Sequence, residues 1–144
     1  MLIGIKNTIN MISKNNKRIA IIGLGYVGFP LAVEFGKFYK TIGYDINKDR
    51  IKELHRGFDS TKEVDSDDIK KSTKLSYVSD IEKIRNCNIL IITVPTPVNN
   101  ENNPDLSFLK SASETVAKSL NKGDIVIYES TVYPGVTEEF CVPI

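Results

Sequence analysis

The sequence predicts an α/β fold, a doubly wound parallel sheet, and three observations support this. A short apolar run, residues 19–22, leads directly into the glycine-rich turn G-x-G-x-x-G at residues 23–28. A second apolar run ends on Asp45, about 20 residues beyond the first glycine, where dinucleotide-binding folds place a ribose-binding carboxylate. Further short apolar runs alternate with amphipathic segments, which is typical of parallel strands joined by helices. Together these features predict a Rossmann-type dinucleotide-binding domain.

The composition limits the classes of protein that the chain can represent. Its 144 residues fit one domain, and 41% hydrophobic with 26% charged residues is ordinary for a soluble globular protein. A net charge of +1 gives no indication of nucleic acid or an anionic membrane as a partner. No apolar run has the length of a membrane span. The two cysteines, Cys87 and Cys141, follow no metal-ligand spacing, so we expect free thiols in a reducing cytoplasm and no metal site.

We expect two parts in the chain. Residues 1–16 carry apolar side chains at helical spacing and predict a short leader helix, with a frayed extension as the alternative. They contain no continuous apolar region, so a signal peptide is not expected. Residues 17–144 form the nucleotide-binding domain. Its last segment, from Thr137, has the pattern of a helix that is still in progress at Ile144, so we expect the chain to belong to a longer protein.

The glycine-rich turn and the helix after it form the predicted phosphate site. Gly23 allows a sharp turn, Gly25 lets a pyrophosphate approach the backbone, and Gly28 lets the helix pack closely on the strand. The helix is predicted over 29–39, with Pro30 in its first turn, where a missing N–H costs nothing. Its N-terminus offers free N–H groups and the positive end of the helix dipole to phosphates.

The second predicted strand, 41–45, sets the choice of cofactor. The carboxylate of Asp45 accepts hydrogen bonds from a ribose 2′-hydroxyl and repels a 2′-phosphate, which favours NAD over NADP. A helix over 47–54, capped by Asn47, follows this strand. Arg50 in this helix is a residue type that pairs with a 2′-phosphate. Because Asp45 stands at the strand end itself, it outweighs Arg50, and we expect the cofactor to be NAD.

The remaining elements extend the alternating pattern. The sequence predicts helices over 65–72, 80–84 and 105–120 and strands over 75–78, 89–94 and 124–128. Four strand ends carry distinctive turns, at 23–28, Asp45, 95–97 and 130–135. Because ligands bind beyond the carboxyl ends of parallel strands, we expect these turns to meet at one crevice.

Five runs of residues together resemble a known family. They are Gly-Leu-Gly-Tyr-Val-Gly (23–28), Gly-Tyr-Asp-Ile-Asn (43–47), Val-Pro-Thr-Pro (94–97), Pro-Asp-Leu (104–106) and Glu-Ser-Thr-Val-Tyr-Pro-Gly-Val-Thr-Glu (129–138). This set resembles the nucleotide-sugar 6-dehydrogenases, the UDP-glucose/GDP-mannose dehydrogenase family, and covers nearly everything from Lys17 onward. The residues of these runs are most similar to the branch that acts on UDP-N-acetylhexosamines for polysaccharide biosynthesis.

The resemblance implies an NAD-dependent oxidoreductase. The family oxidises the C6 alcohol of a UDP-sugar to a carboxylate in two steps with two NAD. Its members have an NAD-binding domain, a central helical segment that forms a homodimer, and a C-terminal nucleotide-sugar domain. The present chain matches only the first of these, so the chain alone is expected to be inactive. The catalytic cysteine of the family belongs to a later segment, and we expect Cys87 and Cys141 to be packing residues.

The resemblance also implies a role for individual residues of the NAD-binding site. Tyr26 and Val27 would lie along the pyrophosphate, Asp45 would bind the adenosine ribose, and Arg50 would flank the adenine side. Thr96 would contact the cofactor, and Ser130 and Thr131 would reach toward the nicotinamide. Thr131 corresponds to the threonine that helps to position the catalytic water, and is the one catalytic candidate.

Two alternatives share part of the pattern. A non-catalytic NAD-binding or sensing module encoded by a truncated gene would share the glycine-rich turn and Asp45. The turns at 94–97 and 129–135 would have no purpose in such a module. A methyltransferase also uses a strand, a glycine-rich turn and an acidic residue on a ribose, but Gly28 suits a dinucleotide and is not needed for a single nucleoside.

Overall fold

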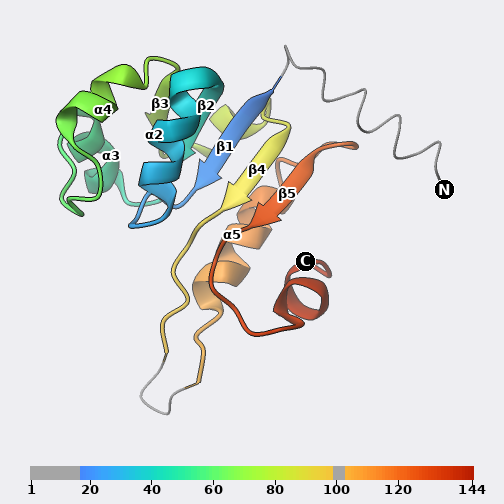
Figure 1. The fold of residues 1–144 in the computed structure, drawn as a ribbon. Coiled ribbons are helices and arrows are strands. Elements are labelled where there is room, and N and C mark those ends of the chain that lie inside the picture. The colour runs from blue at the N-terminus through green and yellow to red at the C-terminus, as the bar shows by residue number, and fades with distance from the viewer. Residues whose placement is uncertain (1–16, 99–102) are drawn as a thin grey trace.

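The computed structural model describes residues 17–98 and 103–144, so the leader helix predicted for residues 1–16 lies outside the described residues. The chain forms a five-stranded sheet with the order β3-β2-β1-β4-β5. The strands are β1 (Arg18–Ile22), β2 (Lys40–Tyr44), β3 (Leu75–Val78), β4 (Ile89–Ile92) and β5 (Ile125–Tyr128). All four neighbouring pairs are parallel, which confirms the predicted doubly wound parallel sheet (Figure 1).

The central strand β1 is apolar and buried from Ile19 to Ile22, because both faces of the sheet are covered. Ile19 and Ile21 face one core cluster, and Ala20 and Ile22 face the other. Ile22, the last residue of β1, lies opposite both Tyr44 of β2 and Ile92 of β4. The carboxyl ends of these three strands therefore lie level with one another.

Helices form a layer on each side of the sheet. The helices α2 (Gly28–Phe38) and α3 (Lys48–His55) contribute Phe29, Val33 and Leu54 to one core cluster, and α4 (Ser66–Lys71) lies beside them at the left of Figure 1. The helix α5 (Ser107–Ala117) and the last segment, η2 (Thr137–Cys141), contribute Leu109 and Cys141 to the other. Two buried clusters separated by a sheet give a three-layer α/β domain.

Side-chain caps explain where several helices begin. Asn47 accepts hydrogen bonds from the N–H groups of Asp49 and Arg50 at the start of α3. The Asp65 carboxylate accepts hydrogen bonds from the first N–H groups of α4. The Asp80 carboxylate accepts from the Glu82 N–H at the start of η1 (Ile81–Ile84). These oxygens satisfy N–H groups that have no partner within the helix.

Three helical segments differ in detail from the sequence-based expectation. The segment expected as a helix over 80–84 is a 3₁₀ turn, η1. The helix expected over 105–120 is α5, which ends at Ala117 and begins at Ser107, where the Ser107 N–H donates to the Asp105 carboxylate. The last helix has π geometry, in which the Val142 N–H donates to the Thr137 carbonyl at 2.9 Å. The expected existence and order of these elements are confirmed.

Both cysteines are free and buried, as expected from their spacing. Burial raises the pKa of the Cys87 thiol to about 11, and burial also raises the pKa of Cys141. A thiol of raised pKa carries little thiolate at neutral pH, so both side chains act as packing residues. Within the described part of the chain, no helix is both long and apolar enough to cross a membrane.

Candidate dinucleotide site

The three glycines of the turn at 23–28 have three different environments. Gly23 has a φ of +96°, a left-handed conformation that other residues rarely adopt. A Cβ added to Gly28 would lie 1.8 Å from the Gly23 carbonyl oxygen, so Gly28 allows close packing beneath the turn. A Cβ added to Gly25 would meet nothing within 4 Å. Gly25 is therefore the member of the turn whose backbone faces open space.

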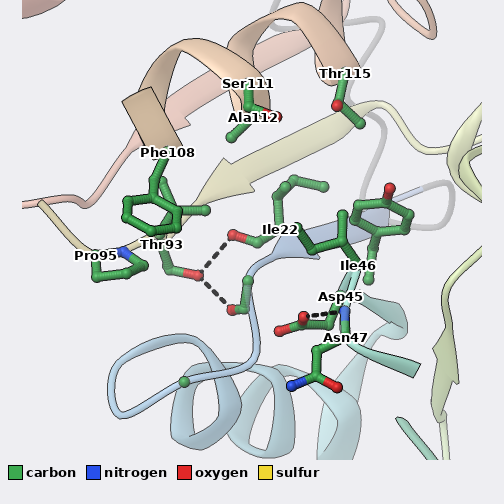
Figure 2. Close-up of a pocket in the computed structure, with 14 residues that line it drawn as sticks. Ile22, Asp45, Ile46, Asn47, Thr93, Pro95, Phe108, Ser111, Ala112 and Thr115 are labelled. Carbon is green, nitrogen blue, oxygen red and sulfur yellow. Dashed lines mark hydrogen bonds between the residues drawn. The ribbon is translucent and has the colours of Figure 1, made fainter. Parts of the chain in front are cut away.

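Thr93 supports the turn from the neighbouring strand. Its hydroxyl lies 3.0 Å from the Ile22 carbonyl oxygen and 2.8 Å from the Gly23 carbonyl oxygen, to which it donates (Figure 2). Thr93 is buried and follows directly after β4. Sequence reasoning placed it inside the strand expected over 89–94 and missed this role. The available signal was its hydroxyl, the one polar side chain in that apolar run.

Asp45 closes the other side of the turn. One carboxylate oxygen accepts from the Leu24 N–H at 2.8 Å, and the other accepts from the Asn47 N–H at 2.8 Å. The carboxylate is therefore held in one orientation by two backbone donors, and each oxygen keeps further lone pairs for a ligand. Asp45 also lies on the wall of a cavity at this strand end.

This first cavity has a volume of about 320 Å³ and lies between the ends of β1, β2 and β4 and the helix α5 (Figure 2). Gly23, Gly25, Asp45 and Thr93 line its floor and one side. The opposite side is formed by four residues of α5: Phe108, Ser111, Ala112 and Thr115. Sequence reasoning placed Ala112 on the apolar face of α5 but missed Phe108, Ser111 and Thr115, because they lie beside that face.

A second cavity, of about 380 Å³, continues from the first along the turn. Gly25, Thr93, Val94 and Pro95 line both cavities, so the two share a wall. The second cavity brings together five residues that the resemblance assigned to the cofactor: Tyr26, Val27, Thr96, Ser130 and Thr131. Tyr26 and Val27 are exposed, although both side chains are large and apolar. The two cavities adjoin at Gly25, and together they are called the groove below.

Two hydrogen bonds connect the turns that follow β4 and β5. The Thr96 hydroxyl donates to the Thr131 carbonyl at 2.5 Å, and the Ser130 hydroxyl donates to the Val94 carbonyl at 2.7 Å. Each hydroxyl has a single proton, and it donates that proton in a hydrogen bond to a carbonyl of the opposite turn. Thr96 and Ser130 therefore offer a ligand their lone pairs while they fix the shape of this end of the groove.

Arg50, which the resemblance assigned to the adenine side of the cofactor, lies beside Leu24 of the turn. Its side chain is buried, lines neither cavity, and donates to the Leu24 carbonyl at 2.9 Å and to the Asp59 carboxylate at 2.7 Å. The guanidinium is thus behind the turn and not on the wall of the groove. Gly28 also lines neither cavity, because it is buried beneath Gly23.

Residues 17–144 match the UDP-glucose/GDP-mannose dehydrogenase family, NAD binding domain. The chain belongs to this family. The resemblance drawn from the five sequence runs is thereby confirmed, and NAD is the cofactor of the domain. The match favours a dehydrogenase over the sensing-module and methyltransferase alternatives.

Characterised relatives place the chain within the family. It is 55% identical to the UDP-N-acetyl-D-glucosamine 6-dehydrogenase of Pseudomonas aeruginosa and 59% identical to that of Salmonella typhi, each over 127 residues. These matches cover 88% of the chain and 30% of each relative. The chain thus spans about a third of the length of these relatives.

Solved structures show the same fold. The UDP-D-ManNAc dehydrogenase of Pyrococcus horikoshii superimposes with a TM-score of 0.77 at 39% identity, over 84% of this chain and 30% of that one. The NDP-N-acetyl-D-galactosaminuronic acid dehydrogenase of Methanosarcina mazei gives a TM-score of 0.84 at 29% identity, over 94% and 32%. The Rossmann-type architecture is therefore shared with known dehydrogenases.

The groove has the chemistry that an NAD-binding domain requires. A carboxylate at the end of β2 offers acceptors for ribose hydroxyls, and the bare backbone of Gly25 lies at the middle of the groove. Within the described residues, no group of three or more His, Cys, Asp and Glu side chains is arranged to hold a metal ion.

Proposed function

We propose that the chain is the NAD-binding part of a nucleotide-sugar 6-dehydrogenase that oxidises the C6 alcohol of a UDP-N-acetylhexosamine to a uronic acid with two NAD. The two cavities that adjoin at Gly25 are the observation that carries this proposal. One is lined by the carboxylate of Asp45, which suits a ribose, and the other by the hydroxyl side chains that the resemblance assigned to the nicotinamide end. Relatives with 55% and 59% identity are UDP-N-acetyl-D-glucosamine 6-dehydrogenases, which supports this substrate class.

The adenosine half of NAD fits the first cavity. The fixed carboxylate of Asp45 would accept from the ribose hydroxyls, and its charge would repel the 2′-phosphate of NADP. The adenine ring would lie between Ile46 and Phe108, since both side chains line this cavity and are exposed. Ser111 and Thr115 on the same wall offer hydroxyl groups to the ring nitrogens.

The remainder of NAD fits the second part of the groove. The pyrophosphate would cross Gly25, with Tyr26 and Val27 along it. The nicotinamide would lie against Thr96 and Ser130, whose turns are fixed by their mutual hydrogen bonds. NAD, when bound, accepts a hydride from the C6 carbon of the sugar. In this proposal the Thr131 side chain orients a water molecule beside the nicotinamide.

The chain supplies only part of the proposed reaction. Cys87 and Cys141 are buried, and neither lines the groove, so the nucleophile that the family uses is expected outside these residues. The residues that recognise the UDP-sugar are likewise expected in the part of the relatives that this chain does not span. We propose that the full-length protein is a cytoplasmic homodimer that serves polysaccharide biosynthesis.

The stoichiometry of the full-length enzyme tests the proposed reaction. Oxidation of an alcohol to a carboxylate removes two hydrides, so we expect two NADH for each UDP-N-acetylhexosamine consumed. Absorbance at the nicotinamide band gives the NADH, and chromatography of the nucleotide sugars gives the substrate and its uronic acid. UDP-glucose is the control substrate and is expected to react more slowly. One NADH per sugar, or an aldehyde as the final product, would contradict the proposal.

A further inference from the structure

The amino ends of the parallel strands lie at the opposite end of the sheet from the groove (Figure 1). Three neighbouring strands begin there with a basic residue. Arg18 opens β1 and lies opposite Lys40, which opens β2. Thr41 lies opposite Leu75, so Lys74, the residue before β3, comes next at the same level. Arg18, Lys40 and Lys74 are called the basic row below.

The basic row has no counter-ions in the part of the chain that the structure describes. None of its three members forms an ion pair within residues 17–98 and 103–144. Among these residues Arg18 Nε is buried without a hydrogen-bond partner, and Lys74 Nζ donates to a neutral group, the Phe38 carbonyl, at 2.9 Å. Neighbouring strands lie about 4.8 Å apart, and like charges opposite one another destabilise a sheet. An anionic partner would offset this unfavourable arrangement.

The charges around the row leave this end of the domain positive. Lys17 precedes the row, and its Nζ lies 5.5 Å from the ring centre of Tyr39. Asp124 precedes β5, two strands away from Arg18, and its carboxylate accepts from the Asn121 N–H of its own turn at 2.8 Å. Four lysines of α2, α3 and α4, by contrast, form ion pairs with carboxylates. A net charge of +1 therefore conceals an uneven distribution.

Exposed apolar groups accompany these cations. Phe38, the last residue of α2, is 67% exposed and is bonded through its carbonyl to Lys74. The sequence before Lys17 includes two lysines, no acidic residue, and aliphatic side chains at helical spacing. Basic side chains beside exposed apolar ones are typical of proteins that bind the surface of an anionic membrane. Nucleic acids stack on aromatic rings and gain little from aliphatic side chains, so the combination favours a membrane.

We propose that the amino end of the sheet is a docking surface for an anionic lipid bilayer: the basic row and Lys17 contact the headgroups, and Phe38 enters the interface. Binding of this kind is peripheral and needs no membrane-spanning helix. The groove lies at the other end of the strands, so it stays open while the domain is docked. The inference is independent of the proposed reaction.

Flotation of the 144-residue chain with lipid vesicles tests this inference. We expect the chain to float with vesicles of phosphatidylcholine that contain about 30% phosphatidylglycerol, and not with phosphatidylcholine alone. The double variant Lys40→Gln and Lys74→Gln should lower the partition coefficient about 10-fold or more, because two headgroup contacts are lost. Glutamine at position 74 keeps a donor for the Phe38 carbonyl.

The matched control removes the same charge elsewhere. Lys52→Gln with Lys70→Gln changes two exposed lysines of α3 and α4, and should lower partitioning less than about two-fold. Phe38→Ala keeps every charge and should lower partitioning about three-fold or more. Equal losses in the two double variants, or a Phe38→Ala chain that floats like the wild type, would contradict the proposed surface.

The remaining outcomes separate this inference from its alternatives. A folded wild-type chain that does not float with the anionic vesicles would overturn it, and retention of a single-stranded oligonucleotide by that chain would assign the surface to nucleic acid. Lys40 and Lys74 line neither cavity, so their double variant should bind NAD like the wild type. A drop in NAD affinity that parallels the loss of flotation would indicate general loosening and overturn the inference. A chain that floats as expected but binds no NAD would support the docking surface and contradict the proposed function.

Discussion

Gly28→Ala is expected to destabilise the fold of the chain, whereas Gly25→Ala should leave the fold intact and abolish NAD binding. A Cβ on Gly28 would lie 1.8 Å from the Gly23 carbonyl oxygen and 2.3 Å from the Thr93 Oγ1. The backbone oxygen cannot move aside without opening the turn. Overpacking of this kind costs about 1–3 kcal/mol or more, against a typical total stability of about 5–15 kcal/mol.

Gly25→Ala is the matched change within the same turn. The added Cβ would meet no atom within 4 Å, so we expect the free energy of unfolding to change by less than about 0.5 kcal/mol. The methyl group would occupy the space through which the pyrophosphate approaches the backbone, and NAD affinity should fall beyond detection. Thermal melts followed by circular dichroism and NAD titrations check both variants. A Gly28→Ala chain that melts like the wild type, or a Gly25→Ala chain with unchanged NAD affinity, would show that the groove has been assigned to the wrong side of the turn.

Asp45→Ala is expected to weaken NAD binding about 100-fold. Hydrogen bonds to a charged acceptor contribute about 1.5–3 kcal/mol each, and about 1.4 kcal/mol corresponds to a tenfold change in affinity. Loss of the carboxylate removes the acceptor for the ribose hydroxyls and also releases the N–H groups of Leu24 and Asn47. Removal of the negative charge should at the same time reduce the preference for NAD over NADP.

Asp49→Ala is the control for this substitution. Asp49 carries the same charge four residues later, but its side chain is exposed and lines neither cavity. Calorimetric titration of both variants with NAD and NADP gives the two affinities directly. Equal NAD affinity in Asp45→Ala and Asp49→Ala would rule out the ribose contact assigned to Asp45.

The sheet and the glycine-rich turn could be predicted because local patterns determine them. The continuous apolar runs of β1 and β4 reflect burial on both faces, and the positions of Gly23 and Asp45 follow from the geometry of a strand, a turn and a helix. The end of β4 was less predictable. Thr93 leaves the strand because its hydroxyl bonds to the Ile22 and Gly23 carbonyls, a contact 70 or more residues away in sequence.

The far wall of the groove could not be predicted from sequence. Phe108, Ser111 and Thr115 lie at helical spacing on α5, but beside its apolar face, where a periodic pattern also places solvent-exposed residues. Their exposure to a cavity follows from the packing of α5 against the sheet. The ion pair between Arg50 and Asp59 could not be predicted either. Asp59 lies in an irregular segment, where no periodicity indicates which side chains are buried.

Direct titration of the folded chain with NAD and NADP is the measurement that tests the account most directly. We expect one NAD to bind per chain, and NADP to bind at least about 10-fold more weakly because Asp45 repels the 2′-phosphate. A chain that is folded by circular dichroism but binds no NAD, or that binds NADP as tightly as NAD, would contradict the account.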